Sequence, residues 1–229
     1  MFYNEEIFDR FIMMLTQEQK EKLFSARVLV FGVGGVGSAF VHMLVRAGIQ
    51  RISIVDFDTI DATNINRQLV AYSNNVGKLK VDELEKQMKL INPNVQVEKY
   101  PLKLSAETIN QISFDCDYIV DCIDDIPAKK ALIKLANEKN IPILSAMGAG
   151  NRYDEIPHFE IENIAKTSYD PIAKILRKFC AEESIKNLQV CYTKQKAHKF
   201  DCKTIGSVVY YPINMASVMC AKVVNDILK

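Results

Sequence analysis

A glycine-rich run, Gly32-Val33-Gly34-Gly35-Val36-Gly37, directly follows an apolar stretch near the start of the chain and narrows the possible folds. Residues 27–31 are β-branched and aromatic, which predicts a buried parallel strand. Apolar residues then recur at helical spacing over 36–47, and Gly48 predicts the end of that helix. A second strand is expected over 51–58. Strand, glycine turn, helix and strand within about 30 residues form the βαβ unit of a doubly wound sheet.

The alternation of strands and helices continues along the chain. Helices are expected over 77–91 and 127–139, and strands over 95–100, 117–122 and 141–146. After residue 150 the pattern weakens. It predicts an irregular or short-stranded region over 151–170, a helix over 172–183, a strand-like then polar stretch over 187–204 and a closing helix over 217–228. We therefore expect an α/β fold: a Rossmann-like, doubly wound, mainly parallel sheet with helices on both faces and a smaller C-terminal extension.

Length and composition favour a single domain. The 229 residues are 48% hydrophobic, which suffices for one large core. We divide the domain into a helical arm (1–26), a nucleotide-binding core (27–150) and an acceptor-substrate side with the closing helix (151–229). The formal net charge of +1 provides no general attraction to nucleic acid. Residues 166–203 are locally basic, which indicates either an RNA patch or a solvated surface.

The sequence contains no stretch that predicts membrane insertion or export. No apolar run approaches the roughly 20 residues of a transmembrane helix, and Glu5, Glu6 and Asp9 contradict a signal peptide. We expect a cytoplasmic protein. The six cysteines are scattered without a C-x-x-C pair for a zinc site, which favours buried thiols.

The glycine turn predicts a phosphate-binding site. Glycine has no Cβ, so the chain can approach a phosphate, and the N-terminal N–H groups of the next helix point at the charge. Gly32, Gly34, Gly35 and Gly37 are therefore candidate cofactor-binding residues, although packing alone could also require them. Asp56 lies 19 positions after Gly37, where a carboxylate can bind a ribose. A nicotinamide dehydrogenase would fit these residues equally well.

Charged residues beyond the turn favour ATP over a dinucleotide. Arg67 and Lys80 can balance the charge of a triphosphate, and Asp124 follows a predicted strand where it could hold Mg²⁺. Asp58 is a further candidate for the nucleotide, with a structural role in its loop as the alternative.

With these residues the chain resembles the ubiquitin-activating-enzyme-like adenylyltransferase superfamily over nearly its whole length. The resemblance implies that Asp56 binds ribose, that Asn64 lies at the nucleotide, that Arg67 and Lys80 contact phosphates and that Asp124 binds Mg²⁺. It also implies a homodimer in which Arg10, 17 residues before residue 27, reaches from the arm into the partner's site.

Within the superfamily, the second half is similar to the tRNA threonylcarbamoyladenosine dehydratases. The matching residues are Met147 to Arg152, Lys166 to Pro171, and Arg177. The resemblance implies ATP-dependent adenylation of the threonyl carboxylate of N6-threonylcarbamoyladenosine in tRNA, followed by ring closure with loss of AMP and no enzyme nucleophile. A sulfur-relay protein is a further partner that the resemblance suggests.

Two other functions fit the same residues. One is adenylation of the C-terminal glycine of a ubiquitin-like sulfur carrier, against which the missing zinc cysteines count. The other is a nucleotide-binding partner protein without catalysis, against which Arg67, Lys80 and Asp124 count.

Several residues depart from the family pattern or invite a catalytic interpretation. Asp125 stands where relatives commonly have Asn or Ser, and it adds negative charge beside a triphosphate. Thr16 replaces a usual glycine near the arm arginine. Cys191 has no adjacent activating charge in the sequence, so we interpret it as a structural thiol. The three histidines lack metal-ligand spacing and are treated as non-catalytic.

Overall fold

The computed structural model describes residues 5–201 and 204–229, and within them a seven-stranded sheet forms the centre of the molecule. The strand order is β3-β2-β1-β4-β5-β7-β6, and every neighbouring pair is parallel except β6 with β7. The strands are β1 (Arg27–Phe31), β2 (Arg51–Val55), β3 (Gln96–Tyr100), β4 (Tyr118–Asp121), β5 (Ile143–Ala146), β6 (Glu160–Asn163) and β7 (Gln189–Tyr192). The predicted mainly parallel, doubly wound sheet is confirmed.

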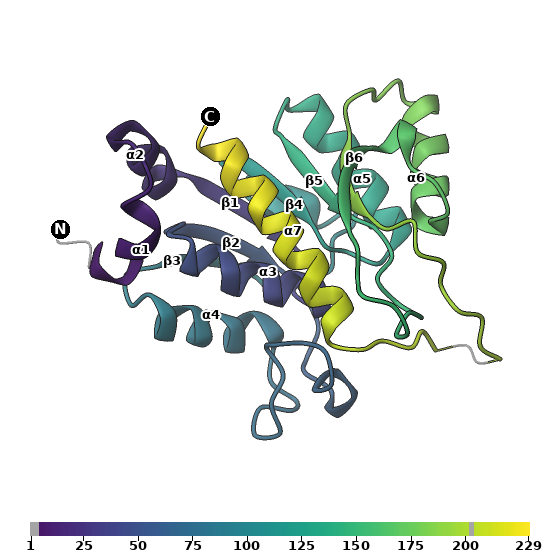
Figure 1. Cartoon of the computed structure of the whole chain (residues 1–229), viewed down its shortest axis with the longest axis horizontal. Coiled ribbons are helices and arrows are strands. Elements are labelled where there is room, and N and C mark those ends of the chain that lie inside the picture. Colours follow the sequence, from purple (N-terminus) through teal and green to yellow (C-terminus); the bar gives the residue numbers. More distant parts are fainter. Residues whose placement is uncertain (1–4, 202–203) are drawn as a thin grey trace.

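Helices cover both faces of this sheet (Figure 1). One face carries α3 (Gly35–Arg46), α4 (Lys80–Ile91) and α7 (Tyr210–Ile227). The other carries α5 (Ile126–Glu138) and α6 (Pro171–Glu182). Side chains alternate across a strand. Val28 and Val30 of β1 therefore pack in the core beneath α3, α4 and α7, whereas Leu29 and Phe31 pack in the core beneath α5. A nearly continuous apolar run in the sequence therefore becomes a strand buried on both sides.

The N-terminal arm packs partly against its own chain. It contains η1 (Glu5–Phe8), α1 (Asp9–Ile12) and α2 (Gln17–Ser25). Thr16 caps α2 in a capping box with Gln19, which is the physical role of the residue that replaces the family's usual glycine. Leu23 is fully buried in the core. The arm is thus anchored at α2.

Some predicted boundaries were wrong. The helix expected from Gly77 begins at Lys80, because Gly77 has a φ of +86° and donates its N–H to Ile60 O at 2.8 Å in a turn. The closing helix begins at Tyr210 rather than Ser217, with Pro212 in its first turn, where proline needs no N–H partner.

The remaining elements are short. They are the 3₁₀ turns η2 (Ala62–Asn64), η3 (Ile109–Gln111) and η4 (Ile164–Lys166). The expectation of short strands in 151–170 is met by β6. Both halves of the chain contribute strands to one sheet. In the described part of the chain, no helix combines the length and apolar character that crossing a membrane requires.

Candidate functional site

The glycine turn connects β1 to α3, and two of its glycines are required by packing. Gly32 has a φ of +81°, and a Cβ there would lie 2.7 Å from the carbonyl oxygen of Cys122. A Cβ on Gly37 would lie 1.8 Å from Gly32 O. These contacts bring β1, α3 and the end of β4 together. Gly37 thus supports the turn from inside α3 and is not among the residues that line the cavity, so packing, the alternative left open for these glycines, accounts for it.

Of the other two glycines, Gly34 is open and Gly35 packs against α7. A Cβ on Gly34 would have only the side chain of Gln68 within 4 Å, at 3.8 Å, whereas a Cβ on Gly35 would lie 3.3 Å from the Cβ of Pro212. Both line a cavity of about 720 Å³ at the carboxyl ends of the strands. The predicted residues that also line it are Gly32, Asp56, Asp58, Asn64, Arg67, Lys80 and Asp124. Arg10, an exposed residue of α1, does not line the cavity of its own chain in the described structure.

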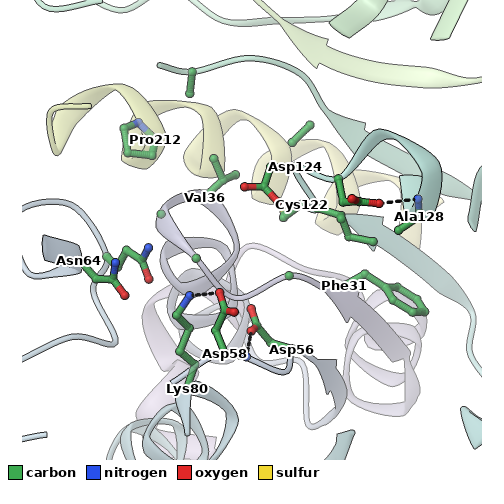
Figure 2. Close-up of a pocket in the computed structure, with 18 of the residues that line it drawn as sticks. Phe31, Val36, Asp56, Asp58, Asn64, Lys80, Cys122, Asp124, Ala128 and Pro212 are labelled. Atoms are coloured by element: carbon green, nitrogen blue, oxygen red, sulfur yellow. Dashed lines mark hydrogen bonds and ion pairs between the residues drawn. The ribbon is translucent and has the colours of Figure 1, made fainter. Parts of the chain in front are cut away.

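Asp56 is a buried carboxylate directly after β2 (Figure 2). Its Oδ2 accepts a hydrogen bond from Val33 N at 2.8 Å, and its Oδ1 accepts one from Asp58 N at 2.9 Å. Burial raises the pKa of Asp56, while the charge of Lys80 and the two backbone bonds oppose that rise. Asp56 therefore ties the glycine turn to β2, and each oxygen retains a lone pair for a ligand hydroxyl.

Lys80 and Arg67 supply the positive charge of the cavity. Lys80 is the first residue of α4, is only 4% exposed, and pairs with Asp58 at 2.7 Å. Arg67 donates from its Nη1 to Thr63 O at 2.7 Å and to the Oδ1 of Asn66 at 2.9 Å. Among the described residues, Lys80 pairs with one carboxylate and Arg67 only with neutral oxygens. A polyphosphate, which carries more negative charge, can therefore compete for both side chains.

Gln68 is a cavity residue that the sequence interpretation did not assign. It is 7% exposed, and its Oε1 has no hydrogen-bond partner among the described residues. A buried acceptor without a partner costs about 1–3 kcal/mol, which a ligand donor can recover. Together with the open side of Gly34, this acceptor fits a nucleotide with hydroxyl or amino donors. In the sequence, the only indication that Gln68 lies at the cavity is its position directly after Arg67.

Asp124 and Asp125 follow β4 and have separate roles. The Asp124 side chain is exposed to the cavity, whereas Asp125 caps α5 by accepting from Ala128 N at 2.9 Å. The residue that departs from the family pattern is therefore engaged by a helix N-terminus, which favours negative charge. In the described residues, no group of three or more His, Cys, Asp or Glu side chains forms a protein-only metal cluster.

A buried ionic network lies beneath the Asp124 loop, and the sequence interpretation missed it. Lys129, Asp121 and Ser145 are all 0% exposed. The Nζ of Lys129 contacts Asp121 Oδ2 at 2.7 Å, Ser145 Oγ at 3.1 Å and Ala146 O at 2.9 Å. Ser145 also donates to Asp121, whose other oxygen accepts from Ile123 N at 3.1 Å. The network joins the ends of β4 and β5 below the cavity.

The second half of the chain adds a loop to the same cavity. Residues 147–150 line it directly. Asp170 holds this loop, since its Oδ2 accepts from Gly148 N at 3.1 Å while its Oδ1 caps α6 at Ala173 N. Arg152, 4% exposed, donates to Gly148 O at 3.2 Å and Gly150 O at 3.0 Å. Both residues position the loop.

The other second-half candidates do not line the cavity. Arg177 donates to the carbonyl and the hydroxyl oxygen of Thr167, at 2.6 and 2.7 Å. Lys166 lies on the surface, 3.9 Å from Glu162. The contacts of these two side chains are thus with their own neighbourhood, away from the cavity.

The cysteine thiols are unsuited to nucleophilic chemistry where the structure describes them. Cys191 is fully buried, and burial raises its pKa. Burial likewise raises the pKa of Cys122 to about 12. A thiol becomes a nucleophile only as thiolate, which these surroundings disfavour. Cys202 lies outside the described residues.

Comparison with known proteins identifies the class. The model of the ThiF family matches residues 8–224, and the chain belongs to this family. The chain is 39% identical over 190 residues to the tRNA threonylcarbamoyladenosine dehydratase of Bacillus subtilis, covering 82% of this chain and 74% of that protein. It is 35% identical over 170 residues to the same enzyme of Haemophilus influenzae, covering 72% of this chain and 65% of that protein.

A solved structure shares the fold over almost the whole chain. The crystal structure of Escherichia coli tRNA N6-threonylcarbamoyladenosine dehydratase in complex with ATP has a TM-score of 0.90 and 24% identity. The match covers 98% of this chain and 94% of that one. At this identity the likeness establishes the fold alone.

Proposed function

We propose that this chain catalyses the ATP-dependent cyclising dehydration of N6-threonylcarbamoyladenosine in tRNA. The observation that carries the proposal is the shared cavity, in which Arg67, Lys80 and Asp124 from the first half meet the loop 147–150 from the second. The second-half residues Met147 to Arg152, Lys166 to Pro171 and Arg177 are those in which the chain resembles the dehydratases. The identity with the Bacillus subtilis and Haemophilus influenzae dehydratases supports this choice.

The proposed reaction needs positioning and charge neutralisation rather than an enzyme nucleophile. The threonyl carboxylate attacks the α-phosphorus of ATP and pyrophosphate leaves. The carbamoyl group of the same modification closes on the activated carboxyl carbon, and AMP leaves with the carboxylate oxygen, for a net loss of water. Arg67 and Lys80 neutralise phosphate charge, and Asp56 accepts from the ribose. The raised pKa of the described cysteines agrees with a reaction that uses no thiolate.

The side chain of Asp124 fits a magnesium ion. Mg²⁺ usually binds proteins through one or two carboxylates and completes its shell with phosphate oxygens and water. The carboxylate of Asp124 faces the cavity, and the neighbouring Asp125 is occupied as a helix cap. The ion would supply further neutralisation of the triphosphate.

The proposal includes a homodimer in which Arg10 completes the partner's site. Arg10 is exposed and lies outside the cavity of its own chain, which leaves its side chain free to reach the cavity of a second copy. We place the reaction in the cytoplasm, with a sulfur-relay protein as a further partner.

An ATP–pyrophosphate exchange assay separates this function from its rivals. The protein is incubated with radiolabelled pyrophosphate and ATP, together with either tRNA carrying the modification or a ubiquitin-like sulfur carrier. We expect exchange and AMP release with the modified tRNA, and none with tRNA lacking the modification. Exchange with the carrier alone would establish the carrier-activating function instead. The absence of exchange with both would favour a nucleotide-binding partner protein.

A further inference from the structure

Two segments of the second half are joined beside the cavity: the loop after β5 and the segment between β7 and α7 (Figure 1). Asn151 N donates to Gly206 O at 2.7 Å, and Gly206 N donates to the Oδ1 of Asn151 at 2.6 Å. His198 N donates to Asn151 O at 2.7 Å. Gly150 and Ile205 of these segments line the cavity. The joined segments are therefore part of its rim.

Exposed aromatic rings cluster on this rim. Tyr153, Tyr169 and Phe200 are 56%, 68% and 49% exposed. The Tyr153 and His198 rings lie 5.0 Å apart, and His198 lies 6.1 Å from Phe200. The Nζ of Lys196 lies over the Tyr169 ring, 5.7 Å from its centroid. We call these five residues, Tyr153, Tyr169, Lys196, His198 and Phe200, the aromatic rim.

Core packing does not account for the aromatic rim. Burying an aromatic side chain is strongly favourable, yet about half or more of each of these three rings remains in water. None of the five residues lines the cavity within the described structure. The exposed part of each aromatic side chain therefore remains available to a ligand that lies outside the cavity.

Exposed lysines accompany the aromatic rim. Residues 194–201 contain Lys194, Lys196 and Lys199 and one acidic residue, Asp201. Lys194 pairs with Glu160 at 2.7 Å, which leaves Lys196 and Lys199 as the cations of this segment that a ligand can reach. The nearby acids of the other segment are engaged: Asp154 contacts His198 at 2.7 Å, and Glu155 contacts Gln195 at 2.7 Å. Lys196 and Lys199 are exposed. A single-stranded nucleic acid matches exposed aromatic rings beside exposed lysines, because it carries negative phosphates and flat bases.

We propose that the aromatic rim binds a single-stranded loop of RNA, with bases stacked on Tyr153 and Tyr169 and a phosphate held by Lys196. The inference rests on the proposed function, because a base that reacts in a cavity has to be unpaired and outside the base stack. Proteins recognise such unpaired bases by stacking on aromatic rings. A protein partner fits less well, since the cores of protein interfaces are depleted in lysine.

The positions on the chain agree with this arrangement. Tyr153 follows the cavity residue Gly150 by three residues, a span of at most about 11 Å. Successive stacked bases rise about 3.4 Å, so a loop resting on Tyr153 can place a nucleotide a few positions away into the cavity. When a base stacks on the Tyr169 ring, the ammonium group of Lys196 moves off that ring and binds a phosphate of the RNA.

The test measures binding of tRNA to the full-length protein by fluorescence anisotropy at several salt concentrations. The variants are Tyr153→Ala, Tyr169→Ala and Lys196→Ala, with Tyr153→Phe and Tyr169→Phe as versions that keep the ring. Tyr72→Ala is the matched control, because Tyr72 is 53% exposed and lies outside the aromatic rim. ATP affinity by calorimetry and urea unfolding confirm that each variant keeps its fold and its nucleotide site.

Each tyrosine-to-alanine change is expected to raise the Kd for tRNA on the order of tenfold, whereas the phenylalanine and Tyr72 variants stay near wild type. Lys196→Ala is expected to lower the salt slope of log Kd by about 0.7. ATP affinity stays unchanged. A single-stranded oligoribonucleotide should compete with tRNA, and an RNA duplex of the same sequence should not.

Unchanged tRNA binding in both alanine variants would overturn the inference. So would variants that bind tRNA normally but lose a sulfur-carrier or sulfur-relay protein, since the aromatic rim would then be a protein-docking surface. Failure of the proposed function has a different signature. Wild-type protein would bind tRNA through the aromatic rim, but modified tRNA would give no pyrophosphate exchange.

Discussion

The buried ion pair between Lys129 and Asp121 stabilises the ends of β4 and β5 below the cavity, and its contribution can be measured directly. Lys129→Met removes the ammonium group and keeps an unbranched side chain of similar length. Asp121 then remains 0% exposed with two of its three partners, Ser145 and the Ile123 amide, but without its counter-charge. The carbonyl of Ala146 also loses a donor.

Removing one partner of a buried ion pair costs about 3–5 kcal/mol, because a charge stays buried without compensation. That cost is a large part of the free energy of unfolding of a typical domain, which is roughly 5–15 kcal/mol. The double variant Lys129→Met with Asp121→Asn removes both charges. We expect it to be less destabilised than Lys129→Met, since the uncompensated charge is gone.

Urea unfolding followed by circular dichroism measures these differences as changes in the midpoint at constant slope. Lys134→Met is the matched control: Lys134 also lies on α5 and pairs with Glu183 at 2.7 Å, but with side-chain exposures of 49% and 35%. Water screens that pair, so little change is expected. Equal midpoints for Lys129→Met and Lys134→Met would refute the argument, and so would a double variant less stable than the single one.

Three further predictions concern the site and its pH dependence. Arg67→Ala should abolish AMP release with modified tRNA while urea unfolding stays near wild type; near-normal turnover would contradict the phosphate role. Mixing Arg10→Ala with Asp124→Ala subunits should restore activity to some dimers, because one of the two sites is then intact, and no recovery would count against a shared site. Burial lowers the pKa of His42 despite its hydrogen bond to Gln87, so its folded pKa lies below its unfolded value of about 6.5. The unfolded state then binds more protons, and the free energy of unfolding should fall as pH drops through 6.5; His42→Gln should flatten this slope, and an unchanged slope would argue against the assignment.

Local sequence patterns were sufficient for the architecture and for much of the site. Strand, turn and helix repeat with clear periodicities, and the carboxyl ends of parallel strands meet at one edge of a sheet. Residues just after those strands, such as Asp56 and Asp124, were therefore predictable as neighbours. The boundary at Gly77 was not, because its turn depends on a hydrogen bond to the distant Ile60.

The order of residues along the chain was enough to predict a doubly wound sheet, a glycine turn and a set of charged residues suited to a triphosphate. What each side chain contacts became visible only in the folded molecule. Gly37 became a packing residue, Asp125 a helix cap and Arg152 a support for the loop 147–150. The burial of Lys129 and the unpaired oxygen of Gln68 were equally invisible in the sequence. The physical reason is that burial and hydrogen-bond partners depend on contacts between segments far apart in the chain, which no local periodicity encodes.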